Sequence, residues 1–410
     1  MRRKGGRGMS EWKKVKLGEV CDTQYGFTTS TVQQDTGTQF LRITDIVPQL
    51  IDWNTVPYCQ IQEKDREKYL LHKGDIVVAR TGATVGYAKY IKEDVPAVFA
   101  SYLVRLLVNS IDVDRHYVGL CVESNLFKEY IQSISNGSAQ PNANAQMISS
   151  FEINLPPLST QHRIATILSR YDSLIENYQK QIKLLEEAAQ RLYKEWFVDL
   201  RFSGHENTKI VDGVPEGWEK KKISDICQTV GGGTPSTKVA EYYDDGNIKW
   251  VTPTDITRSN CLCLFDTDKK ITEDGLAHSS AKILPPETIL MTSRASVGYF
   301  GIYDCEVCTN QGFISCIPNE RSYQMYMLYN LMNRVEEIRQ KAGGSTYLEI
   351  SKSVFRDFDI VLPSCMVLET FQEQSHKMLD CMRQIAKQLR LLTEARDRLL
   401  PKLMSGEITV

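Results

Sequence analysis

The sequence predicts an α+β protein with two similar domains of mixed, strand-rich structure. Two long helices that pair antiparallel as a coiled coil are expected to join these domains, giving a pseudo-two-fold internal repeat. Three observations predict this class. The chain repeats itself at an offset of 206–207 residues, each copy ends in a long heptad pattern, and only a short segment connects the copies.

Four motifs carry the repeat and occur in the same order in both halves. Residues 12–21 (WKKVKLGEVC) return at 218–227 (WEKKKISDIC), 44–46 (TDI) at 254–256 (TDI), 83–87 (ATVGY) at 295–299 (ASVGY), and 151–156 (FEINLP) at 358–363 (FDIVLP). Because the duplication covers nearly the whole chain, each half should be a globular domain of about 150 residues followed by a helix.

The repeat also predicts the domain boundaries. The expected order is a disordered basic arm at 1–11, a first domain at 12–158, a first helix at 159–202, a linker at 203–217, a second domain at 218–364, a second helix at 365–404 and a tail at 405–410. Short β-branched runs at 75–80 and 288–293 follow turn signals and predict strands. Residues 115–134 and 323–338 have helical spacing.

Apolar residues recur in strict heptads along both long helices, which is typical of a coiled-coil seam. The expected interface residues are Ile164, Leu168, Tyr171, Ile175, Tyr178, Ile182, Leu185, Leu192 and Trp196 on the first helix, and Phe371, Met378, Met382, Ile385, Leu389, Leu392, Leu399 and Leu403 on the second. Two seam positions are exceptions, Ser375 and Arg396.

The connection between the halves predicts the direction of the pair. Forty helical residues span about 60 Å, whereas the linker at 203–217 reaches about 50 Å at most and has a turn-rich composition. The helices should therefore run antiparallel. Each helix should then end close to the domain of the opposite half.

Charge and composition exclude several classes of protein. The net charge is −2, with −2 on residues 12–158 and −3 on 218–366, so neither domain is the strongly basic body of a protein that binds DNA unaided. The sequence contains no run of eighteen apolar residues, so it predicts no membrane-spanning helix. Eleven scattered cysteines indicate reduced thiols and a cytoplasmic location.

The sequence does not support catalysis or metal binding. No Gly-Lys-Ser/Thr follows Gly231–Gly233 at P-loop spacing, and Leu155–Leu158 lacks both ends of an adenine methyltransferase motif. The pair Cys305 and Cys308 has no second pair at zinc-site spacing. We therefore expect no catalytic residue, no metal and no cofactor in this chain.

Two similar domains held apart by a stiff helix pair suit duplex DNA, because a two-fold protein reads two half-sites along the double helix. Readers need polar and basic side chains on loops. The candidates are Thr28, Arg80, Thr81, Asn136, Ser138, Gln140, Thr234, Ser293, Arg294, Ser345, Tyr347 and Lys352. The alternative is a coiled-coil scaffold with two protein-binding domains and no DNA role.

An ordered set of motifs resembles the specificity subunit of type I restriction-modification systems. The set comprises 231–237 (GGGTPST), 246–250 (GNIKW), 293–298 (SRASVG), 309–313 (TNQGF) and, before the first long helix, 155–161 (LPPLSTQ). The resemblance runs from about Trp12 to the C-terminus. The first copy departs from it, since 100–102 (ASY) replaces 310–312 (NQG) and 26–30 (GFTTS) replaces the triple-glycine turn.

The resemblance implies a non-catalytic subunit whose two target-recognition domains each read one part of a split double-stranded DNA target. It also implies two modification (adenine methyltransferase) subunits docked on the helix pair, together with restriction (translocase-nuclease) subunits. S-adenosylmethionine, ATP and magnesium would belong to these partners, which would also neutralise much of the DNA phosphate charge. Arg396 should then face a modification subunit or an acidic neighbour on the seam.

Overall fold

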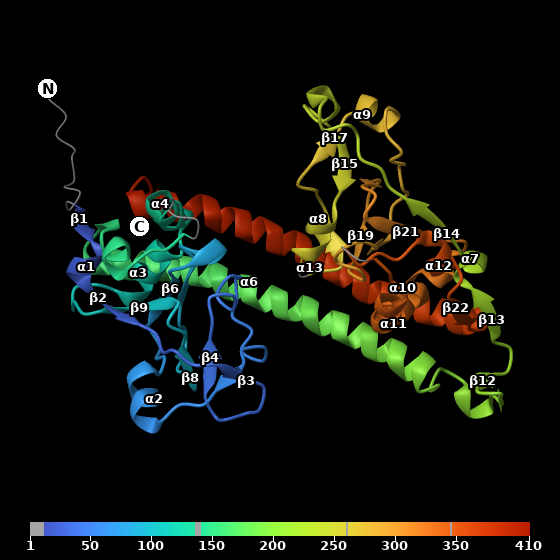
Figure 1. Cartoon of the computed structure of the whole chain (residues 1–410), viewed down its shortest axis with the longest axis horizontal. Coiled ribbons are helices and arrows are strands. Elements are labelled where there is room, and N and C mark those ends of the chain that lie inside the picture. The colour runs from blue at the N-terminus through green and yellow to red at the C-terminus, as the bar shows by residue number, and fades with distance from the viewer. Residues whose placement is uncertain (1–11, 136–140, 260, 345–346) are drawn as a thin grey trace, which may run out of the picture. The chain divides into compact units, whose positions relative to one another are not determined.

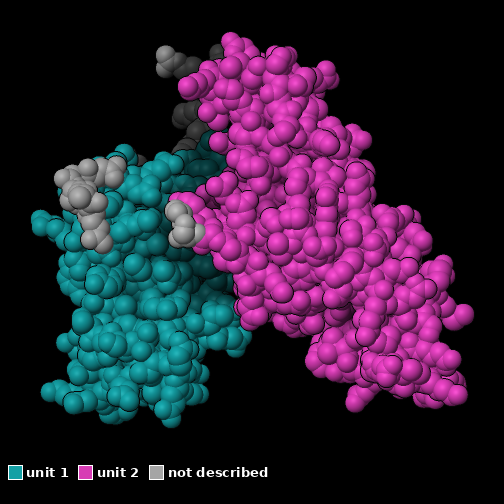
Figure 2. Space-filling model, turned by 45° about the vertical axis from the view of Figure 1, so that its right-hand side comes forward, with its two compact units in different colours: residues 1–176, 392–410 teal, residues 177–391 magenta. Residues whose placement is uncertain are grey.

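The computed structural model describes residues 12–135, 141–259, 261–344 and 347–410. The chain forms two compact units, unit 1 from residues 1–176 and 392–410 and unit 2 from residues 177–391 (Figure 2). Each unit therefore contains one globular domain and a part of both long helices. The last residues of the chain belong with its first domain.

Unit 1 contains two four-stranded sheets and a two-stranded ribbon. The first sheet is antiparallel with the order β2-β9-β6-β7, the second has the order β3-β5-β4-β8 with β4 and β8 parallel, and the ribbon is β1-β10 (Figure 1). The strands are β1 (Lys13–Lys16), β2 (Cys21–Tyr25), β3 (Thr31–Val32), β4 (Gln39–Leu41), β5 (Tyr58–Cys59), β6 (Ile76–Ala79), β7 (Ala88–Tyr90), β8 (Ala97–Phe99), β9 (Leu103–Val108) and β10 (Glu152–Leu155). The short helices are α1 (Leu17–Val20), α2 (Glu63–Tyr69), α3 (Arg115–Val122), α4 (Asn125–Ser135) and α5 (Ala145–Ser149).

Unit 2 repeats this plan. Its larger sheet has the order β14-β21-β18-β19-β16, its smaller sheet the order β17-β15-β20 with β15 and β20 parallel, and its ribbon is β13-β22. The strands are β11 (Ile210–Val211), β12 (Val214–Pro215), β13 (Glu219–Lys222), β14 (Cys227–Gly231), β15 (Ile248–Val251), β16 (Cys263–Leu264), β17 (Lys270–Ile271), β18 (Ile289–Thr292), β19 (Phe300–Tyr303), β20 (Cys308–Thr309), β21 (Phe313–Pro318) and β22 (Asp359–Leu362). The short helices are α7 (Ile223–Ile226), α8 (Pro253–Thr257), α9 (Glu273–Ala277), α10 (Gln324–Asn333), α11 (Val335–Lys341) and α12 (Lys352–Arg356).

The predicted duplication is confirmed strand by strand, since β2-β9-β6-β7 corresponds to β14-β21-β18-β19. The helical segments expected at 115–134 and 323–338 are confirmed, and each consists of two consecutive helices. Ser124 ends the first one, because its hydroxyl accepts the Phe127 N–H at 3.3 Å and starts α4. Arg334, with φ −108° and ψ 18°, separates α10 from α11.

The two long helices are α6 (Leu158–Tyr193) and α13 (Cys365–Ser405), drawn in green and red in Figure 1. A π-helical turn (Lys194–Val198) extends α6, and Leu200 then adopts a left-handed conformation with φ 55°. A left-handed residue cannot continue a right-handed helix. The helix therefore stops before the expected residue 202.

The packing within each unit shows that α6 and α13 run antiparallel, as predicted. In unit 1, Ile164 and Leu168 near the start of α6 share a buried cluster with Leu403 near the end of α13. In unit 2, the end of α6 meets the start of α13, with the rings of Trp196 and Phe371 centred 5.9 Å apart. Each helix thus ends inside the core of the opposite domain, as the connectivity argument predicted.

The structure places most of the expected interface residues in these cores. The buried ones are Ile164, Leu168, Ile175, Ile182, Trp196, Phe371, Met382, Ile385 and Leu403. Partly buried residues that pack against the cores are Tyr178, Leu185, Leu192, Met378, Leu389 and Leu399, while Tyr171 and Leu392 have intermediate exposure. Ser375 is also fully buried, and its hydroxyl donates to the Phe371 carbonyl oxygen at 2.6 Å, so the buried group has a hydrogen-bond partner within the helix.

A charged contact ties the domain of unit 2 to α13. Glu287, at the turn before β18, accepts a hydrogen bond from His376 Nε2 at 3.2 Å and one from Arg383 Nη2 at 3.0 Å. The bond from His376, with a further contribution from Arg383, lowers the pKa of Glu287 to about 2, and the same bond raises the pKa of His376. Glu287 has a left-handed φ of 63°, which a glutamate rarely adopts, so this contact compensates for backbone strain.

None of the helices in the described part of the chain is both long and apolar enough to cross a membrane.

Candidate nucleic-acid interface

In unit 1, the end of the central strand β6 is bridged to the segment that precedes α5. The Ala143 N–H donates to the Arg80 carbonyl oxygen at 2.7 Å, and the Gly82 N–H donates to the Pro141 carbonyl oxygen at 2.9 Å. These two bonds hold Arg80 and the following turn at a fixed position on the rim of the domain.

The same bridge occurs in unit 2 at the end of β18. The Ile350 N–H donates to the Ser293 carbonyl oxygen at 3.0 Å, and the Ala295 N–H donates to the Leu348 carbonyl oxygen at 2.8 Å. Both domains therefore build this rim from the same backbone contacts. We define these two places as the rim sites of unit 1 and unit 2.

The shared backbone gives the residue correspondence between the rim sites. Gly82 and Ala295 make equivalent bonds and are both left-handed, with φ 70° and 61°. Arg80 therefore corresponds to Ser293, and Arg294 stands one position later. Ser293 is only 4% exposed whereas Arg294 is exposed. Since adjacent residues of extended backbone point to opposite faces, the two domains place their arginines differently.

Arg80 is held from two sides in unit 1. Its guanidinium lies over the ring of Tyr25, with Cζ 4.9 Å from the ring centre, and its Nη2 donates to Asn142 Oδ1 at 3.2 Å. The Tyr25 hydroxyl in turn accepts the Ala145 N–H at 3.0 Å. A guanidinium fixed in this way presents its remaining N–H groups in one orientation, which suits recognition of a planar acceptor pair.

The other arginine is less constrained. Arg294 in unit 2 faces Glu349, with Nε 3.6 Å from Oε2, and both side chains are about half exposed. The nearby Tyr347 is 62% exposed. An exposed aromatic side chain and an exposed arginine on the same rim are suited to contact a nucleic acid.

The first strand of each domain ends in a close backbone approach that needs glycine. A Cβ added to Gly26 or Gly232 would overlap the carbonyl oxygen of Ala100 or of Thr309, respectively. This contact identifies Gly26 as the counterpart of Gly232. The candidates Thr28 and Thr234, two residues further on, are exposed in both domains, and the Thr234 hydroxyl donates to Gln311.

Unit 2 also has a hollow of about 480 Å³, which we call the basic groove, and one of its lining residues, Lys352, follows Ile350 of the rim site by two positions. Its lining residues are Gln228, Thr229, Val230, Gly231, Gly232, Ser280, Lys282, Lys352 and Arg356. Three of these nine residues carry positive charge and none is acidic. The groove therefore attracts anions.

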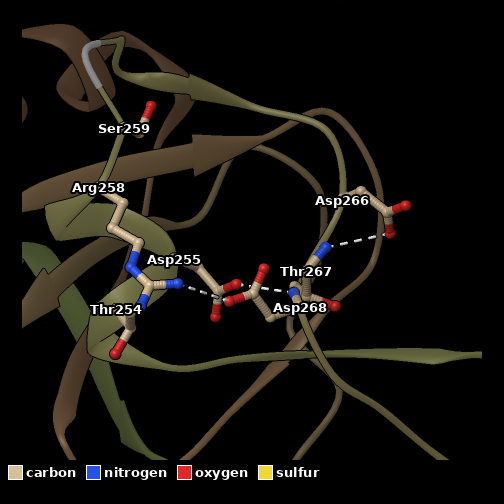
Figure 3. Close-up of a pocket in the computed structure, with 7 residues that line it drawn as sticks. All are labelled: Thr254, Asp255, Arg258, Ser259, Asp266, Thr267 and Asp268. Carbon is tan, nitrogen blue, oxygen red and sulfur yellow. Dashed lines mark hydrogen bonds and ion pairs between the residues drawn. The ribbon is translucent and has the colours of Figure 1, made fainter. Parts of the chain in front are cut away.

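A second hollow in unit 2, of about 390 Å³, has the opposite character (Figure 3). Asp255, Asp266 and Asp268 line it together with Arg258, which forms an ion pair with Asp268 at 3.3 Å. The other two carboxylates accept backbone N–H bonds, as Figure 3 shows for Asp268 N–H to Asp255 at 2.8 Å. Its acidic lining disfavours contact with DNA phosphates.

Some candidates from the sequence cannot be located, and other residues were missed. Asn136, Ser138, Gln140 and Ser345 lie outside the described residues. The residues Tyr25, Asn142, Lys282 and Arg356 lie at these sites but are not among the candidates predicted from the sequence. Only Tyr25 has a signal in the sequence: it corresponds to Gly231 when the two copies are aligned on Gly26 and Gly232.

The family of the chain follows from comparison with known proteins. The family model "Type I restriction modification DNA specificity domain" matches residues 9–187 and 215–398, one match per half of the repeat. The chain therefore belongs to this family, and it has the organisation of a type I restriction-modification specificity subunit.

Similarity to individual specificity subunits supports the same class. The chain is 25% identical to the HindI specificity subunit of Haemophilus influenzae, over 98% of this chain and 100% of that protein. It is 38% identical over 153 residues to the MjaIX specificity subunit of Methanocaldococcus jannaschii, which is 37% of this chain and 35% of that protein. The fold is similar to the specificity subunit structure from M. genitalium, with a TM-score of 0.59 at 15% identity and 98% coverage of both chains.

Proposed function

We propose that the chain is the DNA-reading subunit of a type I restriction-modification complex and that each domain reads one half of a split double-stranded target. One observation carries this proposal: the rim sites have the same backbone in both units but different side chains. Two domains that read different base sequences need the same backbone to position their side chains but different polar side chains to contact the bases.

The helix pair supports the second part of the proposal, that the gap between the half-sites has a fixed length. In each unit the seam of α6 and α13 is continuous with the core of the domain, through Leu403 in unit 1 and Trp196 in unit 2. A coiled coil is stiff and its length is set by the number of heptads. The pair thus acts as the spacer between two half-sites.

We also infer the partners from the family. Two modification (adenine methyltransferase) subunits and restriction (translocase-nuclease) subunits bind this chain, and they hold S-adenosylmethionine, ATP and magnesium. The net charge of −2 supports this, because a reader without a strongly basic surface needs partners to neutralise DNA phosphates. All eleven cysteines are free thiols, which supports a cytoplasmic location.

A selection experiment tests the proposal. The chain is purified with its methyltransferase subunit and used to select DNA from a random-sequence duplex pool. We expect one split motif with two defined half-sites and a fixed gap. Selection of no motif would favour the alternative, a scaffold that binds only proteins.

A domain exchange separates the two readers. Replacing residues 12–155 with the corresponding domain of another specificity subunit should change one half-site and leave the other half-site and the gap unchanged. A change in both half-sites would contradict independent reading by the two domains.

A further inference from the structure

The basic groove of unit 2 contains cations that the protein does not neutralise. Within the described residues, Lys282 and Lys352 make neither an ion pair nor a side-chain hydrogen bond, and both are exposed. Some exposed lysines elsewhere in this unit are paired, such as Lys222 with Asp359 at 2.7 Å. Like charges gathered in one hollow repel each other, and an anion bound between them offsets this repulsion.

The third cation of the groove is fixed in place. Arg356 donates from Nε to the Thr229 hydroxyl at 2.5 Å and from Nη2 to the Thr229 carbonyl oxygen at 3.1 Å. Its side chain is therefore oriented before any ligand binds, with the remaining N–H groups available. Preorganised donors lose less entropy when they bind an anion.

The position of Lys352 depends on a glycine. A Cβ on Gly231 would lie 2.8 Å from Lys352 Nζ, so the lysine side chain lies across the place where any other residue would carry its side chain. Gly231 is the last residue of β14, and Lys352 is the first residue of α12.

Unit 1 fills the same place differently. The last residue of its corresponding strand β2 is Tyr25, and the first residue of its corresponding helix α5 is Ala145. The pair of Tyr25 and Ala145 in unit 1 thus corresponds to the pair of Gly231 and Lys352 in unit 2. Because β2 pairs with β9 as β14 pairs with β21, the exchange places a positive charge here in unit 2 without a change in the strand pairing.

We propose that the basic groove of unit 2 binds a backbone phosphate of the DNA target, with Lys282, Lys352 and Arg356 donating to its oxygens. This inference rests on the proposed function and adds to it the place of a contact that positions the duplex. Phosphate contacts fix the register of a protein on DNA but carry no base information. The site should therefore affect affinity and its salt dependence but not the sequence that is selected.

The test uses the complex of the full chain with its methyltransferase subunit and a duplex that carries the selected motif. Lys352→Gln and Lys282→Gln should each weaken binding by about three- to tenfold at 0.1 M salt. Each should also lower the slope of log K against log salt concentration by about 1. Lys352→Arg should restore both values, and Lys220→Gln on β13, an exposed lysine outside the groove, should change neither.

Duplexes in which a neutral methylphosphonate replaces one phosphate locate the contact on the DNA. Duplexes with one methylphosphonate at a time should show one position where neutralisation weakens wild-type binding but has little further effect on the Lys352→Gln complex. Unchanged affinity and salt slope in the Lys352→Gln and Lys282→Gln complexes, or a changed base preference, would overturn the phosphate site. Failure of the wild-type complex to select any motif would instead overturn the proposed function, so the two failures are distinguishable.

Discussion

Arg396 on α13 donates a hydrogen bond from Nη1 to Oδ1 of Asp172 on α6, at 3.1 Å. Arg396 occupies a heptad position where an apolar residue is expected, and the two side chains are 23% and 16% exposed. The arginine also contacts Asp397 at 2.7 Å. Of the two roles expected for Arg396, the structure shows the acidic neighbour on the seam.

This pair predicts an energetic coupling between the helices. Arg396→Ala and Asp172→Ala should each destabilise the chain, and the double variant should lose less than the sum of the single losses. The coupling should be about 0.5–3 kcal/mol, because a partly buried charge left without its partner is costly. Urea unfolding of the four chains measures it, with Arg398→Ala on the exposed side of α13 as the control. Strictly additive losses would contradict the pairing.

The end of the chain should stabilise its first domain. Leu403 is 1% exposed and lies in the same buried cluster as Ile164 and Leu168. Leu403→Ala should lower the free energy of unfolding by about 2–5 kcal/mol and increase hydrogen exchange in β1 and β10. Leu391→Ala, at a residue that is 59% exposed, is the matched control and should have a small effect. Equal losses for both variants would show that α13 does not complete this core.

The contact between Glu287 and His376 predicts a pH dependence of unit 2. The lowered pKa of Glu287, about 2, adds stability that is present above its ordinary value of 4.5 and is lost as the pH falls towards 2. The raised pKa of His376 adds stability that is present below its ordinary value of 6.5 and is lost as the pH rises through the raised value. Both contributions are complete between about pH 4.5 and 6.5.

Hydrogen exchange of residues 285–303 and 371–386 measures this contact. We expect protection to decrease as the pH rises above 6.5, after correction for the intrinsic exchange rate. His376→Gln should remove that dependence, while His278→Gln, at an exposed histidine of the same unit, should retain it. A wild-type profile that is flat above pH 6.5 would be inconsistent with a protonated His376 in the contact.

Arg80 should determine a base preference in the half-site of unit 1. Because Tyr25 and Asn142 orient its guanidinium, Arg80→Ala should relax the preference at one position by about 1–3 kcal/mol, or about 5- to 150-fold. Selection from the random pool and binding to single-base variants measure the change. Tyr25→Phe, which keeps the ring, should largely preserve the preference. If Arg80→Ala weakens all sequences equally, Arg80 contacts a phosphate instead.

The repeat, the sheets and the antiparallel helices could be predicted because their signals are local or periodic in the sequence. Heptads identify the seam without tertiary information, and paired motifs identify equivalent strands. The burial of Ser375 could not be predicted, because its hydroxyl bond to the Phe371 carbonyl lies within the helix and leaves no mark in the apolar pattern.

The details of the rim sites could not be predicted in the same way. The motifs align residue 83 with residue 295, but the backbone shows that Gly82 is the true counterpart of Ala295. One extra residue in the turn of unit 1 causes this shift, and only φ angles and hydrogen bonds reveal it. The contacts of Arg80 with Tyr25 and of Lys352 with Gly231 join residues distant in sequence, so a single sequence does not indicate them.

The most direct test of whether the helix pair sets the gap between the half-sites is the DNA motif that a chain with a lengthened helix pair selects. One heptad is inserted after Leu185 and one after Leu392, which preserves the seam register in both helices. The spacer should become longer by about 10 Å, and the gap should increase by about three base pairs while both half-sites stay unchanged. A folded complex that selects different half-site bases, or the original gap, would contradict the division between reading domains and a measuring helix pair.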